Sequence, residues 1–342
     1  MKRDPCLLPA RLRADRLPKL GEPLLDRYVE FVATRCRPNT VLASVSDLRA
    51  FFKVIDKPPT AVSTADVLAF IAEQRQPRPG RVNVIRLSDG EAGLSSRTIQ
   101  RRLATVSGLF SWLVMVGDVN ANPVPRGLTT RRTRGRRNVV PLIRSPRTLP
   151  KILEPAEVDR LITALRRWRD RAMVEAMVLG GLRRCEVLGL RMSDLRAGEG
   201  RVFINEGKGG HQRLIPIAGR FFRTLGVYLD TERPATLTER VFVVLKGRRR
   251  GQPLSEDGLD EIIRAARHRA RLSHCSCHEL RHTCLTRLRE AGMALEAVQA
   301  QAGHRSIEST RIYLHLANEW LAGEYLRAAQ LIEAARVEGA AR

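Results

Sequence analysis

The sequence predicts a mainly α-helical protein of two domains, with a small antiparallel β-sheet in the second domain. Three observations support this fold class. The chain has 342 residues, a length that suits two domains. Apolar residues recur at spacings of three and four along most of the regularly patterned segments, as they do on one face of a helix. Only two short runs, on either side of a glycine-rich turn at residues 207–210, have the pattern of paired strands.

The predicted first domain is a helical unit at residues 21–119, which follows an N-terminal extension at residues 1–20. Three of its segments carry a helical apolar stripe, and each has near its start a residue that can cap the first turn. Residues 77–94 contain prolines and glycines, so we expect a loop there. The residues expected to cap or end these helices are Asn39 or Thr40, Ser63, Ser95 or Ser96, and Gly117.

Residues 120–153 are predicted to link the two domains. They contain several prolines and no aspartate or glutamate, so the segment is strongly electropositive. A basic run is often only a solvated tail. This one lies between two folded units, so we expect it to follow a phosphate backbone. The predicted backbone-binding residues are Arg131, Arg132, Arg134, Arg136 and Arg137.

The predicted second domain spans residues 154–342. Its two strands enclose a turn in which glycines flank Lys208, and glycines permit a sharp hairpin. The tail at residues 318–337 has a broad apolar stripe that can pack on its own domain or on a neighbouring copy. The expected helices are 154–165, 170–179, 255–271 and 278–291, and the expected strands are 201–205 and 212–217.

The charge of the chain indicates a polyanionic partner. Lysine and arginine total 60 against 36 acidic residues, which gives a formal net charge of +24. Nucleic acid is the first candidate, and an anionic membrane surface is the second. The prolines of the linker disfavour an amphipathic membrane helix. Composition alone is also compatible with a basic, ribosome-associated protein.

Hydropathy and cysteine content indicate the cellular location of the protein and the state of its thiols. No stretch approaches the ~18 apolar residues of a spanning helix, and the N-terminus lacks a continuous apolar segment, so we expect a cytoplasmic protein. Six cysteines are too few for a disulfide scaffold, so reduced thiols are expected. Cys275, Cys277 and His278 resemble metal ligands, but no second pair follows at zinc-site spacing, so no metal is expected.

Polar residues in the second half of the chain indicate which reaction the protein can catalyse. A helix places His278 and Arg281 on one face, because they are three positions apart. Arg183 and Glu186 have the same spacing, and Glu186 is expected to orient an arginine rather than to act as an acid. Each signal is weak when taken alone. Together, two arginines, a lysine, two histidines and a tyrosine can hold a phosphodiester, attack it and protonate its leaving oxygen; they are Arg183, Lys208, His278, Arg281, His304 and Tyr313.

The strings around these residues resemble those of the tyrosine recombinase (phage-integrase-type) family. GLRRCEVLGL, GKGG, HELRH, AGH and the final tyrosine occur in the family's order and approximate spacing, over roughly residues 150–320. Residues 21–119 are similar in pattern to the family's N-terminal core-binding domain. Ala302 stands where a leucine commonly precedes the Gly-His pair. Cys185 and Cys284 occupy positions often held by small or aromatic residues, and neither departure removes a catalytic group.

The resemblance implies a DNA strand-exchange mechanism. The two arginines would clamp the scissile phosphate, and His304 would hydrogen-bond it. Tyr313 would attack the phosphorus and form a 3′-phosphotyrosine. Lys208 would protonate the 5′ leaving oxygen, and His278 would serve as the acid–base partner. Because the covalent intermediate keeps the bond energy, the resemblance implies no nucleotide cofactor and no metal.

The implied partners are double-stranded DNA and further copies of the chain, as a dimer on each site and a tetramer in the synapse, with or without accessory proteins. The expected location is the nucleoid region of the cytoplasm. The chain length and the N-terminal extension favour a mobile-element integrase, active in transposition or phage integration, over chromosome-dimer resolution. Two alternatives stay open: a type IB topoisomerase-like enzyme that relaxes DNA, and a non-catalytic DNA-binding regulator.

Overall fold

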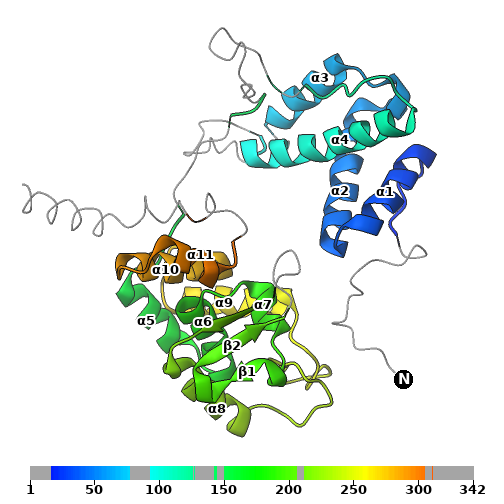
Figure 1. Cartoon of the computed structure of the whole chain (residues 1–342). Helices are drawn as coiled ribbons and strands as arrows, with labels where there is room; N and C mark the ends of the chain where they lie inside the picture. The colour runs from blue at the N-terminus through cyan, green and yellow to red at the C-terminus, as the bar shows by residue number, and fades with distance from the viewer. Residues whose placement is uncertain are drawn as a thin grey trace, which may run out of the picture. The chain divides into compact units, whose positions relative to one another are not determined.

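The computed structural model describes residues 17–77, 93–125, 127, 142–144, 150–205, 212–304 and 310. The chain divides into two compact units, Met1–Thr148 and Leu149–Arg342 (Figure 1). Both units are helical, and the second also contains a three-stranded antiparallel sheet. The predicted fold class is therefore confirmed. Within the described ranges, no helix has both the length and the apolarity needed to cross a bilayer.

The first unit buries one apolar core between its helices. Phe51 and Phe70 are fully buried and meet edge to face, with their ring centroids 4.9 Å apart. This edge-to-face geometry adds to the stabilisation from apolar burial. The helices of the unit are α1 (Pro23–Arg35), α2 (Pro38–Ile55), α3 (Thr64–Arg75) and α4 (Ser96–Val116), with a 3-10 turn at Pro59–Ala61.

Most of the predicted helix boundaries in this unit are confirmed. Ser63 forms a capping box with Asp66 at the start of α3, and the Ser95 hydroxyl accepts a hydrogen bond at the start of α4. Gly117 ends α4 with φ of 87°. The prediction that Asn39 or Thr40 begins α2 is wrong, because Pro38 takes the first helical position. Proline suits that position, since its φ is already helical and its missing N–H would have no partner there.

Parts of the predicted linker pack against the folded units. Val124 and Ile143 are buried in the core of the first unit, and Gln100 Nε2 donates a hydrogen bond to the carbonyl oxygen of Ile143 at 2.7 Å. Leu153 is buried in the core of the second unit. The five arginines predicted to bind the DNA backbone, at residues 131–137, lie outside the described residues.

The second unit combines its helices with a sheet of order β1-β2-β3. In this sheet, Val202 pairs with Ile215, and Ile204 pairs with Arg213. Both predicted strands and all four predicted helices are present, with ends that differ by at most two residues. The elements are α5 (Pro155–Ala164), α6 (Trp168–Gly180), α7 (Arg184–Gly189), β1 (Leu195–Arg196), β2 (Arg201–Ile204), β3 (Arg213–Pro216), α8 (Gly219–Thr231), α9 (Glu256–Arg269), α10 (Cys277–Glu290) and α11 (Leu295–Ala302), with 3-10 turns at Met192–Asp194 and Ala197–Glu199.

Helix α6 is the central element of this unit. It is buried almost all round, and it packs against α8 and α10 (Figure 1). Helix α10 also packs against α11. A helix that is buried on almost every side must have neighbours on those sides, so α6 fixes the positions of the elements packed around it. The chain leaves α6 through Gly181, whose φ is 67° and whose carbonyl oxygen accepts a hydrogen bond from Arg281 of α10.

Candidate active site

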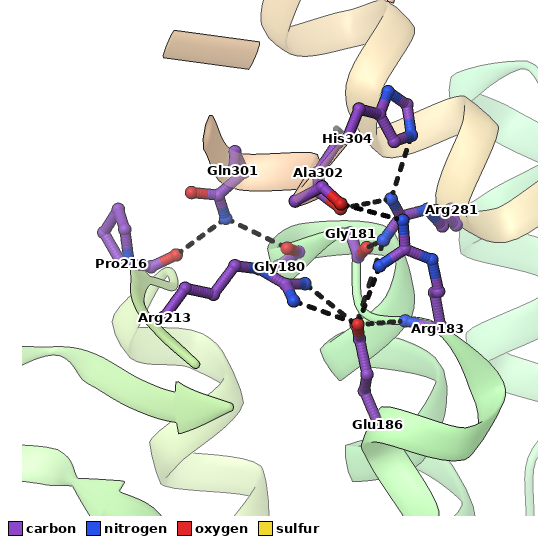
Figure 2. Close-up of polar contacts among 11 residues, drawn as sticks. Gly180, Gly181, Arg183, Glu186, Arg213, Pro216, Arg281, Gln301, Ala302 and His304 are labelled. Carbon is purple, nitrogen blue, oxygen red and sulfur yellow. Dashed lines mark hydrogen bonds and ion pairs between the residues drawn. The ribbon is translucent and has the colours of Figure 1, made fainter. Parts of the chain in front are cut away.

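Glu186 is the centre of the polar cluster in Figure 2. It lies in the first turn of α7, and its side chain has no exposed surface. Its Oε1 accepts hydrogen bonds from Arg183 Nη1 at 2.8 Å and Arg213 Nη1 at 3.0 Å. Its Oε2 accepts from the Arg183 backbone N–H and from Arg213 Nη2, both at 2.9 Å. A third guanidinium, that of Arg281, comes within 3.9 Å of Oε2.

The arginines around Glu186 determine its ionisation. Burial alone would raise the pKa of this carboxyl, because it disfavours the charged form. The hydrogen bonds and charge of Arg213, together with those of Arg183, outweigh burial and lower the pKa from 4.5 to about 2. The carboxylate is therefore ionised at neutral pH. Three guanidinium groups around one carboxylate leave a local excess of positive charge, which suits an anionic ligand.

Arg281 connects this cluster to the ends of two helices. The residue is 2% exposed and lies on α10. Its Nη1 donates to the carbonyl oxygen of Gly181, and its Nη2 donates to that of Ala302 at 2.6 Å. Because Ala302 contributes its carbonyl oxygen, this contact does not require the leucine that commonly precedes the Gly-His pair.

His304 adjoins the same guanidinium. Arg281 Nη2 lies 3.2 Å from His304 Nε2, and arginine can only donate, so Nε2 is the acceptor. Burial, together with the charge of Arg281, lowers the pKa of His304 to about 4. The neutral ring therefore carries its proton on Nδ1, which donates to Thr310 Oγ1 at 3.0 Å. This contact joins the Gly-His turn to a residue three positions before Tyr313.

His278 and His282 form a pair on α10. Their Nε2 atoms are 2.8 Å apart, and their ring centroids are 4.1 Å apart. One Nε2 must donate and the other accept. Burial and the charges of His278 and Arg281 lower the pKa of His282 to about 4, so this ring is neutral at pH 7. The pair therefore shares one proton at this contact.

Two of the four tyrosines are core residues. Tyr28 is 7% exposed and Tyr228 is fully buried, and burial raises the pKa of both phenols. The Tyr228 hydroxyl donates to the carbonyl oxygen of Val241 at 3.0 Å. Neither phenol is available as a surface nucleophile. The other two tyrosines, Tyr313 and Tyr325, lie outside the described residues.

Among the predicted site residues, the structure thus brings together Arg183, Glu186, Arg281 and His304. His278 lies on the same helix as Arg281, and the charge of Arg281 contributes to the lowered pKa of its partner His282. Lys208, like Tyr313, falls outside the part of the chain that the structure describes.

The sequence patterns did not single out Arg213 or Gln301. Arg213 occurs in a predicted strand, and nothing local indicates that its side chain reaches α7. Gln301 is buried, and its Nε2 donates to the carbonyl oxygens of Gly180 at 2.9 Å and Pro216 at 3.1 Å. It therefore ties α11 to the end of α6 and to β3 (Figure 2). The contact of Arg213 with Glu186 and that of Gln301 with Gly180 each join residues more than 25 positions apart in the chain, so no local pattern indicates them.

The cysteines near α10 do not form a metal site among the described residues, where no cluster of three potential metal ligands occurs. Burial raises the pKa of Cys275 and Cys277 to about 12, so both are protonated thiols at neutral pH. The Cys277 thiol donates to Asp260 Oδ1 at 3.5 Å. These residues are packed thiols in the core.

Gly303 allows the close approach of Arg213 to the Gly-His turn. Its φ is 60°, and a Cβ at this position would lie 2.9 Å from the Arg213 guanidinium. Gly292 has φ of 89° but open space around it. We expect Gly292→Ala to lower the free energy of unfolding by about 1 kcal/mol through backbone strain. Gly303→Ala should lower it by about 1–3 kcal/mol more through the clash. Urea unfolding measures both, and equal losses would contradict the contact.

The lowered pKa of Glu186 predicts a pH-dependent stability. The unfolded chain takes up this proton near pH 4.5, whereas the folded chain takes it up only near pH 2. Its contribution is therefore complete above about pH 5 and is lost as the pH falls towards 2. The difference in unfolding free energy between wild type and Glu186→Gln should shrink by roughly 1 kcal/mol between pH 7 and pH 3.5. A difference that stays constant over this range would contradict the ion pairs.

Comparison with known proteins first defines the class. The family model described as "Phage integrase family" matches residues 151–319. The model described as "Phage integrase, N-terminal SAM-like domain" matches residues 25–117. The two matches cover the site-bearing unit and the helical unit before it. The class is that of the site-specific DNA recombinases.

Individual relatives give the family. The chain is 31% identical to the tyrosine recombinase XerC of Roseiflexus castenholzii over 302 residues, which cover 82% of this chain and 84% of that protein. It is 28% identical to the tyrosine recombinase XerD of Listeria monocytogenes over 310 residues, or 86% and 94% of the two chains. The chain belongs to the tyrosine recombinase family.

Solved structures agree on the fold. The post-cleavage complex of the XerH site-specific recombinase with palindromic difH has a TM-score of 0.64 at 20% identity, and covers 94% of this chain and 85% of that one. A lambda integrase (75–356) dimer bound to a COC′ core site has a TM-score of 0.62 at 19% identity, with coverages of 85% and 94%. At these identities the likeness establishes the fold alone.

Proposed function

We propose that this recombinase cuts and rejoins DNA at a specific site through a 3′-phosphotyrosine formed by Tyr313. One observation carries the proposal. Arg183 and Arg281, almost 100 positions apart, converge on one buried carboxylate, and Arg281 also contacts His304. A second contact leads on from there, because His304 binds Thr310, three residues before the proposed nucleophile.

The site residues take distinct roles in the proposed reaction. The guanidinium groups of Arg183 and Arg281 bind the non-bridging oxygens of the scissile phosphate and oppose the charge of the transition state. The Tyr313 oxygen forms a bond to phosphorus while the bond from phosphorus to the 5′ oxygen breaks. His278 takes the phenolic proton, and Lys208 gives a proton to the 5′ oxygen. The 5′-hydroxyl of another strand then reverses these steps and rejoins the DNA.

His304 has to change its hydrogen bonding for its proposed role. In this structure Nε2 accepts from Arg281, and the proton lies on Nδ1. To donate to a phosphate oxygen from Nε2, the ring must gain or move a proton. A phosphate oxygen that becomes the acceptor for Arg281 releases Nε2 for this purpose. Glu186 supports the arginine pair from the side opposite His304.

The proposed partners are double-stranded DNA and other copies of the chain. The basic segment at residues 120–153, with the five arginines at residues 131–137, would follow the DNA backbone, and two copies would occupy one site and four the synapse. Structures of this fold include a lambda integrase dimer on a core site and a tetramer on a Holliday junction. The proposed biological role is integration or transposition of a mobile element. Inverted half-sites or element ends in the DNA flanking the coding sequence would support that role.

A suicide duplex tests the proposed chemistry. The substrate carries the flanking half-sites and a nick a short distance to the 3′ side of the scissile phosphate, so that the short fragment bearing the 5′-hydroxyl diffuses away and the intermediate accumulates. We expect a DNA-linked protein that survives denaturation. Absence of an adduct on every candidate site would contradict the proposal. Rapid relaxation of any supercoiled plasmid, without recombinant products, would support a topoisomerase instead.

A further inference from the structure

Arg213 contributes more contacts to the cluster than its place on a strand suggests. It is the first residue of β3, and its side chain crosses to α7, where it binds both carboxylate oxygens of Glu186 (Figure 2). The Arg213 side chain is 13% exposed and that of Glu186 is completely buried. A two-pronged bond between a planar guanidinium and a buried carboxylate fixes the orientation of both groups.

Three arginine side chains surround the Glu186 carboxylate. Arg183 shares Oε1 with Arg213, and Arg281 stands at 3.9 Å from Oε2. With Arg213 in place, the single carboxylate is largely neutralised by Arg213, so Arg183 and Arg281 keep most of their positive charge. Without Arg213, the same carboxylate would draw Arg183 and Arg281 towards itself and cancel part of the charge that they direct at an anion.

A second contact connects Arg213 to the Gly-His turn. The Arg213 guanidinium occupies the space in which a side chain at position 303 would begin, 2.9 Å from an ideal Cβ. The carbonyl oxygen of Gly303 accepts a hydrogen bond from Arg183 Nη2 at 3.2 Å. Arg213 therefore lies against the turn that supplies this carbonyl, and it binds the carboxylate that orients the first nitrogen of Arg183.

We propose that Arg213 is a positioning residue for DNA cleavage, which acts through Glu186 on the charge and orientation of the Arg183–Arg281 pair. The inference rests on the proposed phosphotyrosine chemistry. Arg213 does not act on the phosphate directly in this scheme. Its loss slows the chemical step, whereas the affinity for DNA, which depends on contacts along the whole duplex, stays nearly constant.

The same scheme predicts a change in the pH profile of cleavage. The groups facing Glu186 are Arg183, Arg213 and Arg281, with Cys185 and His304 close by. Hydrogen bonds from Arg213 are the largest influence that lowers the pKa of Glu186, and burial opposes them. Arg213→Gln should therefore raise this pKa. As the solution is acidified, the cleavage rate of this variant should begin to change at a higher pH than that of the wild type.

The experiment measures single-turnover adduct formation on the suicide duplex at saturating DNA, together with DNA affinity and the thermal midpoint. We expect Arg213→Gln to slow adduct formation about 30–100-fold, with a Kd for the duplex within about threefold of wild type. Arg213→Lys should recover about tenfold of this loss, because it keeps the charge but not the fork. In a Glu186→Gln background, adding Arg213→Gln should change the rate by less than about threefold.

Arg220 provides a matched control. It donates to the buried carboxylate of Glu175 at 2.8 Å, in the same unit but outside the cluster. Arg220→Gln also leaves a buried carboxylate without its arginine, and we expect it to lower stability while leaving the rate of adduct formation unchanged. If Arg213→Gln fails to fold, Arg213→Lys and the double variant with Glu186→Gln carry the test, since removing both charges together avoids an unpaired buried ion.

Three outcomes would overturn the inference. The first is a wild-type rate of adduct formation in Arg213→Gln. The second is an equal loss of this rate whether residue 186 is glutamate or glutamine. The third is a loss of DNA affinity with no loss of this rate. Failure of the wild-type protein to form any adduct would instead overturn the proposed function. The two failures are therefore distinguishable.

Discussion

Replacing Tyr313 with phenylalanine is expected to abolish the covalent DNA adduct, with a loss of more than about 10⁴-fold in the cleavage rate. The change removes only the phenolic oxygen, so DNA binding and the thermal midpoint should stay close to those of the wild type. The measurement is adduct formation on the suicide duplex, separated on a denaturing gel, with DNA affinity determined in parallel.

The structure narrows the choice of nucleophile among the tyrosines. Tyr28 and Tyr228 are core residues, and the Tyr228 hydroxyl is bonded to the backbone. Burial raises the pKa of both phenols, which makes their nucleophilic forms still less accessible. Tyr325 is the remaining tyrosine and serves as the matched control. We expect Tyr325→Phe to form the adduct at the wild-type rate.

An adduct that persists in Tyr313→Phe would contradict the assignment. Peptide mapping of the DNA-linked product would then identify the residue that carries the phosphate. Loss of the adduct in Tyr325→Phe, with Tyr313→Phe unaffected, would move the nucleophile to Tyr325. An adduct on a serine or threonine would reject phosphotyrosine chemistry altogether.

The second large effect is expected for Arg183→Lys, which should slow cleavage about 10²–10³-fold. Lysine keeps the charge but loses the planar fork. Arg183 uses that fork to bind Glu186 through Nη1 and Gly303 through Nη2, and this holds the guanidinium in one orientation. A lysine cannot satisfy both partners and also hold a phosphate oxygen.

The adjacent arginine offers a control for this substitution. Arg184 turns away from the cluster to α9, where it pairs with Asp260 and with Glu256 Oε2 at 2.5 Å. Arg184→Lys changes the same residue type at the next position, the first residue of α7, and we expect a cleavage rate within about threefold of wild type. Single-turnover rates at saturating DNA measure both variants. Equal losses in the two variants would indicate a structural effect on α7 rather than a role for Arg183 at the phosphate.

Much of the fold could be predicted from local signals. The capping residues Ser63 and Ser95 and the left-handed Gly117 act within one turn of their helices, so short strings identify them. The start of α2 was predicted incorrectly because Pro38 competes with two good capping residues that follow it. The resemblance of five separated motifs identified the family, which both family models and full-length relatives confirm.

The contacts inside the site could not be predicted in the same way. The spacing of Arg183 and Glu186 suggested a pair, but not that a strand residue would share the same carboxylate. The φ of 60° at Gly303 is a local reason for glycine, but the lack of room for a Cβ there comes from Arg213, 90 positions earlier in the chain. Likewise, Ala302 is accommodated because its carbonyl oxygen, rather than its side chain, binds Arg281.

The sequence by itself determined the helical character, the charge that attracts a polyanion, and the family, because these depend on residue type and on spacing within short segments. Only the tertiary structure decided that Arg183, Arg213 and Arg281 meet at one buried carboxylate, and that His304 is neutral with its proton on Nδ1. Hydrogen bonds and burial between distant segments exist only once the core around α6 has formed. The charge and orientation of these groups are therefore properties of the fold.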